Sequence, residues 1–169
     1  MSLVKVATGK VEVELVRIHA ELDSQVEEMY RANASKGKLK SGETMQKTLD
    51  ICDTAFQRLR NLLNAHFSWI FNESVIVTQT DVDLLKEIAR TKFKEIYEKA
   101  AQILRRSAEL SGKPDIYGFC LPKLTASMKN SEDQMILFID GEALVKRNRG
   151  ARRFFNIAFG WISKLFKYS

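Results

Sequence analysis

Residues 45–71 read MQKTLDICDTAFQRLRNLLNAHFSWIF and carry mostly apolar side chains at alternating steps of four and three residues. These positions are Met45, Leu49, Cys52, Phe56, Leu59, Leu63, His66 and Ile70. Such spacing lines up side chains along one face of an α-helix. Phe67 and Phe71 widen that face beyond the narrow seam of a coiled coil, which suits a bundle core. We therefore predict a long helix over residues 43–72, with His66 among its core residues.

Two flanking segments repeat this helical period. Residues 11–34 carry Val11, Leu15, Ile18, Leu22, Val26 and Met29, and residues 80–110 carry Val82, Leu85, Ala89, Phe93, Ile96, Ala100, Ile103, Ser107 and Leu110. Thr80 with Asp83 resembles a capping pair, and Gly112 and Pro114 supply a stop. Three long helices with short connections predict an all-α, up-down helical bundle. We assign residues 1–145 to this bundle domain.

Three segments leave alternatives open. Val4, Val6, Val11 and Val13 alternate around Thr8-Gly9, so a short hairpin competes with a helix there. Residues 113–130 show no clear period, and we expect them to cross the bundle without regular structure. Residues 135–145 fit a small hairpin turning at Asp140-Gly141, or a short helix whose capping box is Ser131 with Gln134. We favour the helix, which gives one or two shorter C-terminal helices after the three long ones.

Phosphate loops, metal sites and cofactor sites find little support in the sequence. Gly37 and Gly42 have the separation of a phosphate-binding loop, but Glu43 stands where its lysine should follow and no strand precedes it. Cys52, Cys120, His19 and His66 are the only cysteines and histidines, and they form no close cluster. We therefore predict two buried thiols, no disulfide, no metal and no cofactor.

The terminal and apolar segments bear on location. The first residues lack the apolar run of a signal peptide, and no stretch of 18 apolar residues occurs. Two thiols without a disulfide fit a reducing compartment. We expect a cytoplasmic protein, with a peripheral position at a membrane as a further option.

The basic charge is concentrated at the end of the chain. Residues 1–145 hold 20 Lys and Arg against 21 Asp and Glu, whereas residues 146–169 hold seven Lys and Arg and no acid. A local excess of this kind is typical of segments that meet an anionic partner. We treat residues 146–169 as a basic amphipathic C-terminal helix that is packed on the bundle or extends from it.

The C-terminal segment separates into two faces when it is placed on a helix. Arg152, Arg153, Lys164 and Lys167 share a polar arc, and the remaining surface is wide and rich in aromatic residues, as in an interfacial membrane helix. The alternatives are a last core helix of the bundle and a contact with a homodimer mate or another protein. Nucleic acid fits less well, because the aromatic residues face away from the cations. The candidate residues for contact with a membrane or partner are Lys146, Arg147, Arg149, Arg152, Arg153, Phe155, Phe159, Trp161, Lys164 and Lys167.

A short motif in the central helix suggests a different function. Arg60-Asn61-Leu62-Leu63-Asn64-Ala65-His66 resembles the Arg-x(4–6)-His signature of HEPN domains, which are all-α and include metal-independent ribonucleases of toxin and phage-defence systems. The resemblance implies that Arg60 stabilises phosphate charge, that His66 transfers protons with help from Asn61, and that a homodimer completes the site. Six positions separate Arg60 from His66 by about 120° around a helix, so one helix alone does not bring them together. Ser68 stands where many members carry a tyrosine.

These patterns favour a non-enzymatic helical interaction or regulatory module. Its basic, aromatic C-terminal helix would contact an anionic surface or a protein partner. The alternative is a HEPN-like ribonuclease or a degenerate relative of one. The first hypothesis predicts loss of function when residues 146–169 are removed, and the second predicts loss when Arg60 or His66 alone is changed.

Overall fold

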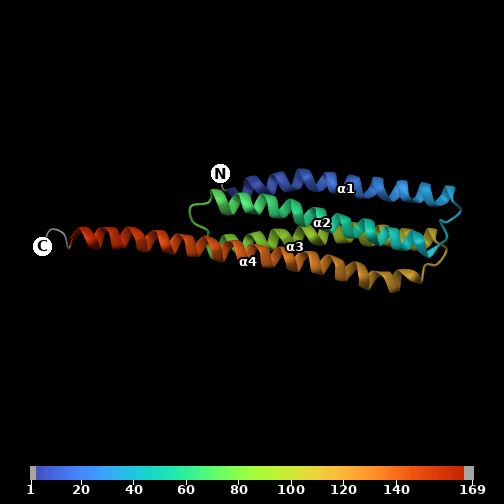
Figure 1. Ribbon diagram of the computed structural model, residues 1–169. Coiled ribbons are helices and arrows are strands. Elements are labelled where there is room, and N and C mark those ends of the chain that lie inside the picture. Colours follow the sequence, from blue (N-terminus) through green and yellow to red (C-terminus); the bar gives the residue numbers. More distant parts are fainter. Residues whose placement is uncertain (1–2, 166–169) are drawn as a thin grey trace.

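The computed structural model of the protein describes the backbone of residues 3–165 and the side chains of residues 3–148. This part of the chain forms four α-helices: α1 (Leu3–Ser35), α2 (Gly42–Glu73), α3 (Gln79–Leu110) and α4 (Ile116–Leu165). They run up and down in chain order and form an elongated bundle, from which α4 projects at one end (Figure 1). Within residues 3–165 there is no strand. The predicted all-α helical bundle is therefore confirmed.

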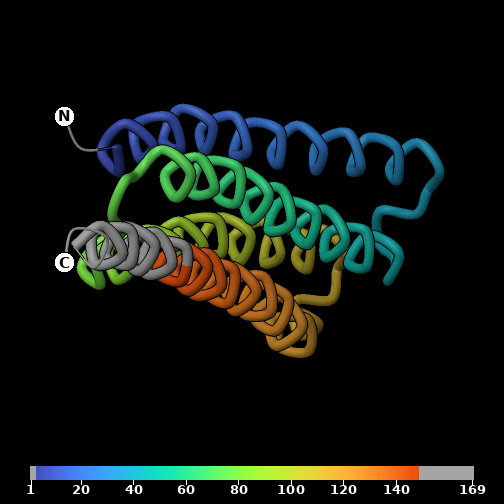
Figure 2. Tube along the Cα trace, turned by 60° about the vertical axis from the view of Figure 1, so that its left-hand side comes forward, coloured from blue at the N-terminus to red at the C-terminus, as the bar shows by residue number. Residues whose placement is uncertain are grey.

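The helices are arranged around α2 and α3, which contact each other along the middle of the bundle. Helix α1 packs mainly on α2 and less on α3, whereas α4 packs on both α2 and α3. Within the described residues α1 and α4 do not touch, and they lie on opposite sides of the bundle (Figure 2). Each of these two outer helices therefore keeps a face that no other described helix covers.

Side-chain bonds fix how α4 lies against α2, to which it runs parallel. Arg60 donates to Gln134, Ser127 donates to Asp53, and Lys146 donates to the Asn72 carbonyl; each pair is 74 residues apart. This constant separation means that α4 follows α2 in one register along its whole length. It also means that α4 reaches the end of α2 at about Lys146.

Helix α4 corrects the prediction for residues 113–145. The segment expected to be irregular and the segment expected to form a short helix or hairpin belong to one 50-residue helix. Its bundle-facing side is made by Cys120, Leu124, Ser131, Met135, Ile139 and Ala143, all of which are buried. A cysteine, a serine and an alanine made this stripe too weakly apolar to recognise. Pro122 is the seventh residue of α4, so the helical bond that it cannot donate and the crowding of its ring affect only the first two turns.

The beginnings of α1 and α3 also differ from the sequence predictions. Residues 4–13 are helical and no hairpin forms, because Val4, Ala7 and Val11 share the buried face of α1. Helix α3 begins at Gln79 with Thr78 as its N-cap, and Asp81 completes the capping box. The predicted pair of Thr80 and Asp83 was therefore two residues too late.

The core of α2 matches its predicted stripe for most of the length. Leu59 and Leu63 are 0% exposed, and Phe56 is equally buried. The prediction for His66 is wrong: this side chain is half-buried, and Phe67 is 1% exposed in its place. An α-helix has 3.6 residues per turn, so a repeat of 3.5 drifts around it over several heptads. By the fourth heptad the drift has carried the core position from His66 to Phe67.

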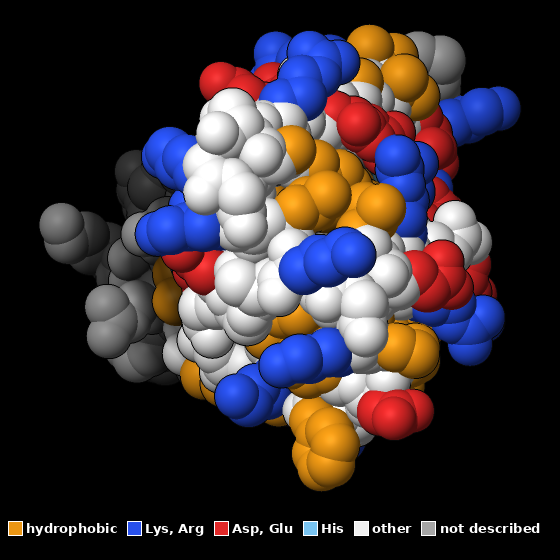
Figure 3. Space-filling model, turned by 90° about the vertical axis from the view of Figure 1, so that its right-hand side faces the viewer, with side chains coloured by type: hydrophobic (Ala, Val, Ile, Leu, Met, Phe, Trp, Pro, Cys, Tyr) orange, Lys and Arg blue, Asp and Glu red, His pale blue; other side chains and the backbone are white. Residues whose placement is uncertain are grey.

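A buried polar cluster joins three helices near the end where α1 turns into α2. Tyr30 Oη lies 2.6 Å from Ser107 Oγ, which lies 2.8 Å from Thr48 Oγ1. Asn33 Nδ2 donates to Thr44 Oγ1 at 2.9 Å, and Lys47 Nζ donates to Asn33 Oδ1 at 3.3 Å. Figure 3 looks onto this end, where hydrophobic side chains gather between Lys and Arg side chains. Because buried polar groups need partners, the cluster fixes the relative register of α1, α2 and α3.

Candidate functional sites at the open end of the bundle

Lys146 and Arg147 mark the point where α4 leaves the other helices. Lys146 Nζ donates to the Asn72 carbonyl at 3.3 Å, and Arg147 donates to Gln79 Oε1 at 2.7 Å. Asn72 stands at the C-terminal end of α2, where a cation is favourable because the last carbonyls carry partial negative charge. These two predicted contact residues therefore fasten α4 to the bundle.

Helix α4 continues as a helix from Asn148 to Leu165, beyond the ends of α2 and α3 (Figure 1). This extension is about 25 Å long at 1.5 Å per residue. The side chains of the other candidates lie outside the described residues; these are Arg149, Arg152, Arg153, Phe155, Phe159, Trp161 and Lys164, and Lys167 follows the last described backbone residue. Within the described residues no helix is both long and apolar enough to cross a membrane.

Arg60 and His66 face different neighbours. Arg60 is half-buried and donates to Gln134 on α4, while Asn61 is exposed. His66 lies on the side of α2 that meets α1, beside Lys10 and Glu14. The structure therefore does not bring the arginine and the histidine together within one chain. A site that used both would need a second subunit.

The surroundings of His66 weaken its affinity for a proton. Burial of the ring and, after it, the positive charge of Lys10 lower the pKa of His66 below its ordinary value of 6.5, although Glu14 acts in the opposite direction. The imidazole is therefore mainly neutral near pH 7. A neutral imidazole can donate one hydrogen bond and accept another.

A groove between α1 and α2, which the sequence analysis did not identify, contains His66. It has a volume of about 700 Å³ and is lined by Val6, Gly9, Lys10 and Val13 of α1 and by Leu62 and His66 of α2, with Lys5 and Glu14 at its edges. Lys10 Nζ lies 5.3 Å from the ring centre of Trp69 on α2. The signal that could have found the groove is a second stripe on α1, Val6-Gly9-Val13-Val16, beside the core stripe.

A buried lysine ties α1 to α3. Lys92 Nζ lies 2.6 Å from Glu12 Oε1 of α1 and 2.8 Å from Glu95 Oε1 of its own helix. Burial disfavours the ammonium charge, but the hydrogen bonds to Glu12 and Glu95 outweigh it and raise the pKa of Lys92. Both carboxylates are engaged by this one cation, so the cluster has the character of a structural tie between helices.

Metal chemistry has no geometric support in the part of the chain whose side chains are described. No group of three or more His, Cys, Asp or Glu side chains lies close enough there to hold an ion. Cys52 and Cys120 are both buried free thiols, as predicted. Comparison of the chain with protein-family models, with curated proteins and with solved structures found no match.

Proposed function

We propose that the protein is a helical interaction module that binds anionic membrane surfaces through residues 146–169. The observation that carries this proposal is the continuation of α4 to Leu165, past the point where α2 ends and α3 begins. A bundle-core role for this segment would need helices beside it. The register of α4 on α2 places the last such contact at about Lys146.

The apolar side of the extension continues the bundle-facing side of α4. Eighteen residues, which are five turns of an α-helix, lead from the buried Ala143 to Trp161, and Phe154 lies about 20° from the same line. The bonds between α4 and α2 end at Lys146, before these positions are reached. This apolar side is therefore proposed to meet a partner outside the bundle.

Charge and aromatic content together suit the interface of an anionic bilayer. Residues 146–169 carry seven Lys and Arg and no acid, and five of these cations follow Lys146 and Arg147, whose side chains bond to the bundle. Each cation near a negatively charged leaflet contributes about 1 kcal/mol, and aromatic side chains enter the boundary between headgroups and acyl chains. Neither term alone gives stable attachment, but the extension supplies both. Because the electrostatic part is screened, the attachment weakens as salt rises.

Co-sedimentation with vesicles tests the proposal. Arg152, Arg153 and Lys164 are changed together to glutamate in one variant. The matched control changes Lys36, Lys123 and Lys129, which are exposed on the bundle, in the same way. Vesicles of phosphatidylserine and phosphatidylcholine should bind the unaltered chain and the control variant, in a salt-sensitive manner, but not the tail variant.

Two results would contradict membrane binding by the tail. One is sedimentation with purely neutral vesicles that equals sedimentation with anionic vesicles, which would show that the cations do not contribute to binding. The other is equal loss of binding in the tail variant and the control variant, which would show that binding depends only on the net charge of the protein.

A further inference from the structure

The groove between α1 and α2 has the shape and chemistry of a ligand site that is independent of the C-terminal extension. Its volume of about 700 Å³ lies in the range of small-molecule sites. Its walls come from two well-packed helices, because Val11 and Leu63 are buried directly beneath the α1–α2 contact. The site is thus preformed on rigid elements.

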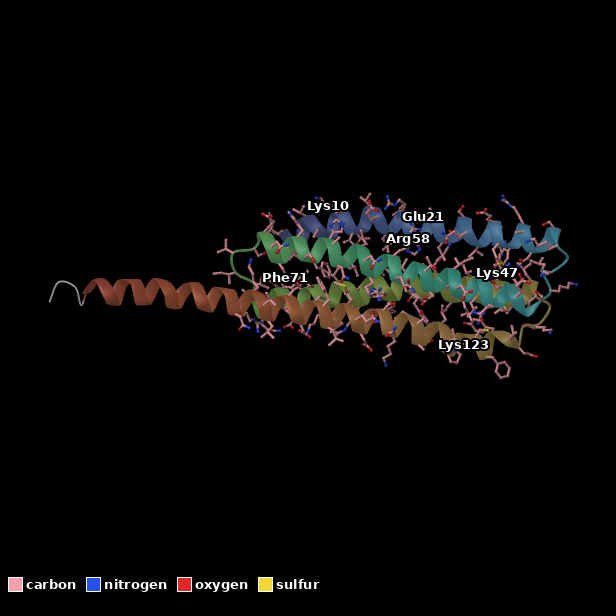
Figure 4. All side chains as sticks on the ribbon, in the orientation of Figure 1. Lys10, Glu21, Lys47, Arg58, Phe71 and Lys123 are labelled. Carbon is pink, nitrogen blue, oxygen red and sulfur yellow. The ribbon has the colours of Figure 1, made fainter. Side chains whose placement is uncertain are left out.

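The two ends of the groove differ in charge. Lys5 and Lys10 lie toward the end where α1 begins and α2 ends (Figure 4 shows Lys10 there), whereas Val13 and Leu62 line the other end. His66 lies level with Val13, because the antiparallel register of α1 and α2 pairs Lys10 with Trp69 and Glu21 with Arg58. The two ammonium groups attract an anion, while the valine and leucine side chains offer only apolar contact. A ligand that fits both ends carries a negative head and an apolar chain.

The apolar part continues beyond the groove on the outer face of α1. Val13 is 71% exposed and Val16 is 70% exposed, and no described residue of another helix covers them. Exposed valines in line with an apolar groove extend the surface on which a chain can lie. The lining of α1 from Lys5 to Glu14 spans about 13 Å at 1.5 Å per residue. That length accommodates an extended chain of roughly ten carbon atoms, because successive C–C bonds of about 1.5 Å advance by somewhat less than their length.

Glu14 lies at the far end of the groove, and its negative charge favours one orientation of the ligand. Its carboxylate forms an ion pair with Arg17 at 2.5 Å on the same helix. An anionic head would be repelled from this end and attracted to the end with Lys5 and Lys10. The charge pattern therefore sets the orientation of the ligand along α1.

We propose that this groove binds a medium-chain fatty acid, with the carboxylate at Lys5 and Lys10 and the acyl chain along Gly9, Val13 and Leu62, past the neutral ring of His66. Lys5 Nζ and Lys10 Nζ donate charge-assisted hydrogen bonds to the carboxylate. Trp69, which lies under Lys10 with its ring centre 5.3 Å from Nζ, forms part of the site around the head. The acyl chain fills the groove with apolar contact.

Gly9 provides a direct way to block the site. A Cβ atom built at Gly9 meets no other atom within 4 Å, and the same holds for Gly141 on α4. Gly9→Leu therefore places a side chain in the groove without a clash, and it replaces a poor helix former by a good one. Gly141→Leu makes the same chemical change on a distant exposed surface and is the matched control.

Quenching of Trp69 fluorescence by dodecanoate with a bromine atom on the carbon next to the carboxylate measures occupancy, because Trp69 lies at the head of the ligand. Trp161→Phe is present in every protein of the experiment, so that Trp69 is the only tryptophan. We expect saturable quenching that is unchanged by Gly141→Leu and weakened about tenfold in affinity by Gly9→Leu. Lys10→Gln should weaken binding by a similar factor because it removes a charged donor, whereas Lys36→Gln should not.

Several outcomes would overturn the fatty-acid site. Absence of quenching, or quenching that Gly9→Leu leaves unchanged, would show that the groove is not occupied by the chain. Equal affinity for the brominated alcohol of the same length would show that binding does not need an anionic head. Sedimentation that shows a dimer for the Trp161→Phe protein and a monomer for Gly9→Leu would identify the groove as a contact between two copies of this chain.

Discussion

Cys52 illustrates how the bundle controls the chemistry of a single side chain. It is 0% exposed, and burial, followed by the charge of Asp53, raises the pKa of its thiol to about 12. The thiolate is the reactive form of cysteine, so the folded protein holds almost none of it at neutral pH. Cys52 is therefore inert as long as α2 stays packed.

Thiol labelling tests this protection. In a Cys120→Ser variant, Cys52 should not react with a disulfide reagent at pH 8 in the native protein and should react fully after unfolding in denaturant. A thiol buried this deeply is labelled only when the whole bundle opens. Rapid labelling without denaturant would show that the α2 core is looser than described.

His66 makes stability depend on pH below its ordinary pKa of 6.5. Its pKa is lowered in the folded state, so the unfolded chain binds the proton first as pH falls. Well above pH 6.5 the ring is neutral in both states and contributes no pH dependence. As pH drops through the window between the ordinary and the lowered pKa, the free energy of unfolding decreases.

His66→Gln should remove this contribution. We expect the difference in the free energy of unfolding between pH 7.5 and pH 5 to be smaller in the variant than in the unaltered protein, measured by urea denaturation. His19→Gln is the control, because it makes the same chemical change at the other histidine of the sequence, which lies on α1 outside the groove. Identical pH profiles for the unaltered protein and His66→Gln would contradict the assigned environment.

At the scale of elements, α2 carries the core of the bundle. Leu63 is 0% exposed and lies where α2 meets its neighbours, whereas the adjacent Leu62 is half-buried at the groove. Leu63→Ala removes apolar contacts and leaves a cavity, which costs about 2–5 kcal/mol. Chemical denaturation should show this loss for Leu63→Ala and for Leu59→Ala, and a clearly smaller one for Leu62→Ala. A loss below about 1 kcal/mol at both core positions would place the core on another face.

Regular apolar periods explain which helices the sequence could reveal. Helices α2 and α3 repeat large side chains at helical spacing, and even the buried Ser107 fell on the predicted stripe of α3. Its partners Tyr30 and Thr48 come from other helices and could not be inferred from one period. Helix α4 was missed as a single element because Ser131 and Ala143 occupy core positions, which left residues 113–130 without a clear apolar period and residues 135–145 ambiguous.

Side-chain partners across the bundle depend on how the helices are placed relative to one another. The apolar pattern of a single segment carries no information on that placement. The sequence suggested that Arg60 and His66 belong together, whereas α2 directs Arg60 toward Gln134 on α4 and His66 toward α1. The groove depends on the same placement, because Gly9 and Leu62 line one groove only when α1 packs on α2. Lys146 and Arg147 were predicted as contact residues from charge alone, and their bonds to the ends of α2 and α3 required the α2–α4 register.

At the scale of the whole molecule, the bundle is closed at one end and extended at the other. The cluster of Tyr30, Thr48 and Ser107 fixes the helices near the α1–α2 turn, and ion pairs such as Glu21 with Arg58 hold α1 to α2 along the bundle (Figure 4). The opposite end holds the first turns of α1, the groove and the departure of α4. Both proposed binding surfaces therefore lie at or beyond the same end of the molecule.

Trp161 emission tests most directly whether the apolar face of the extension is a free surface that meets anionic membranes. The measurement uses Trp69→Phe, so that Trp161 alone emits, with Trp161→Phe as the matched control that reports on Trp69. Without lipid, the account predicts emission typical of a water-exposed indole. Vesicles containing phosphatidylserine should shift it to shorter wavelength, neutral vesicles should not, and Trp69 should stay unchanged. Emission that is already at short wavelength without lipid, and that vesicles leave unaltered, would contradict the account, because the apolar face would then be buried within the protein.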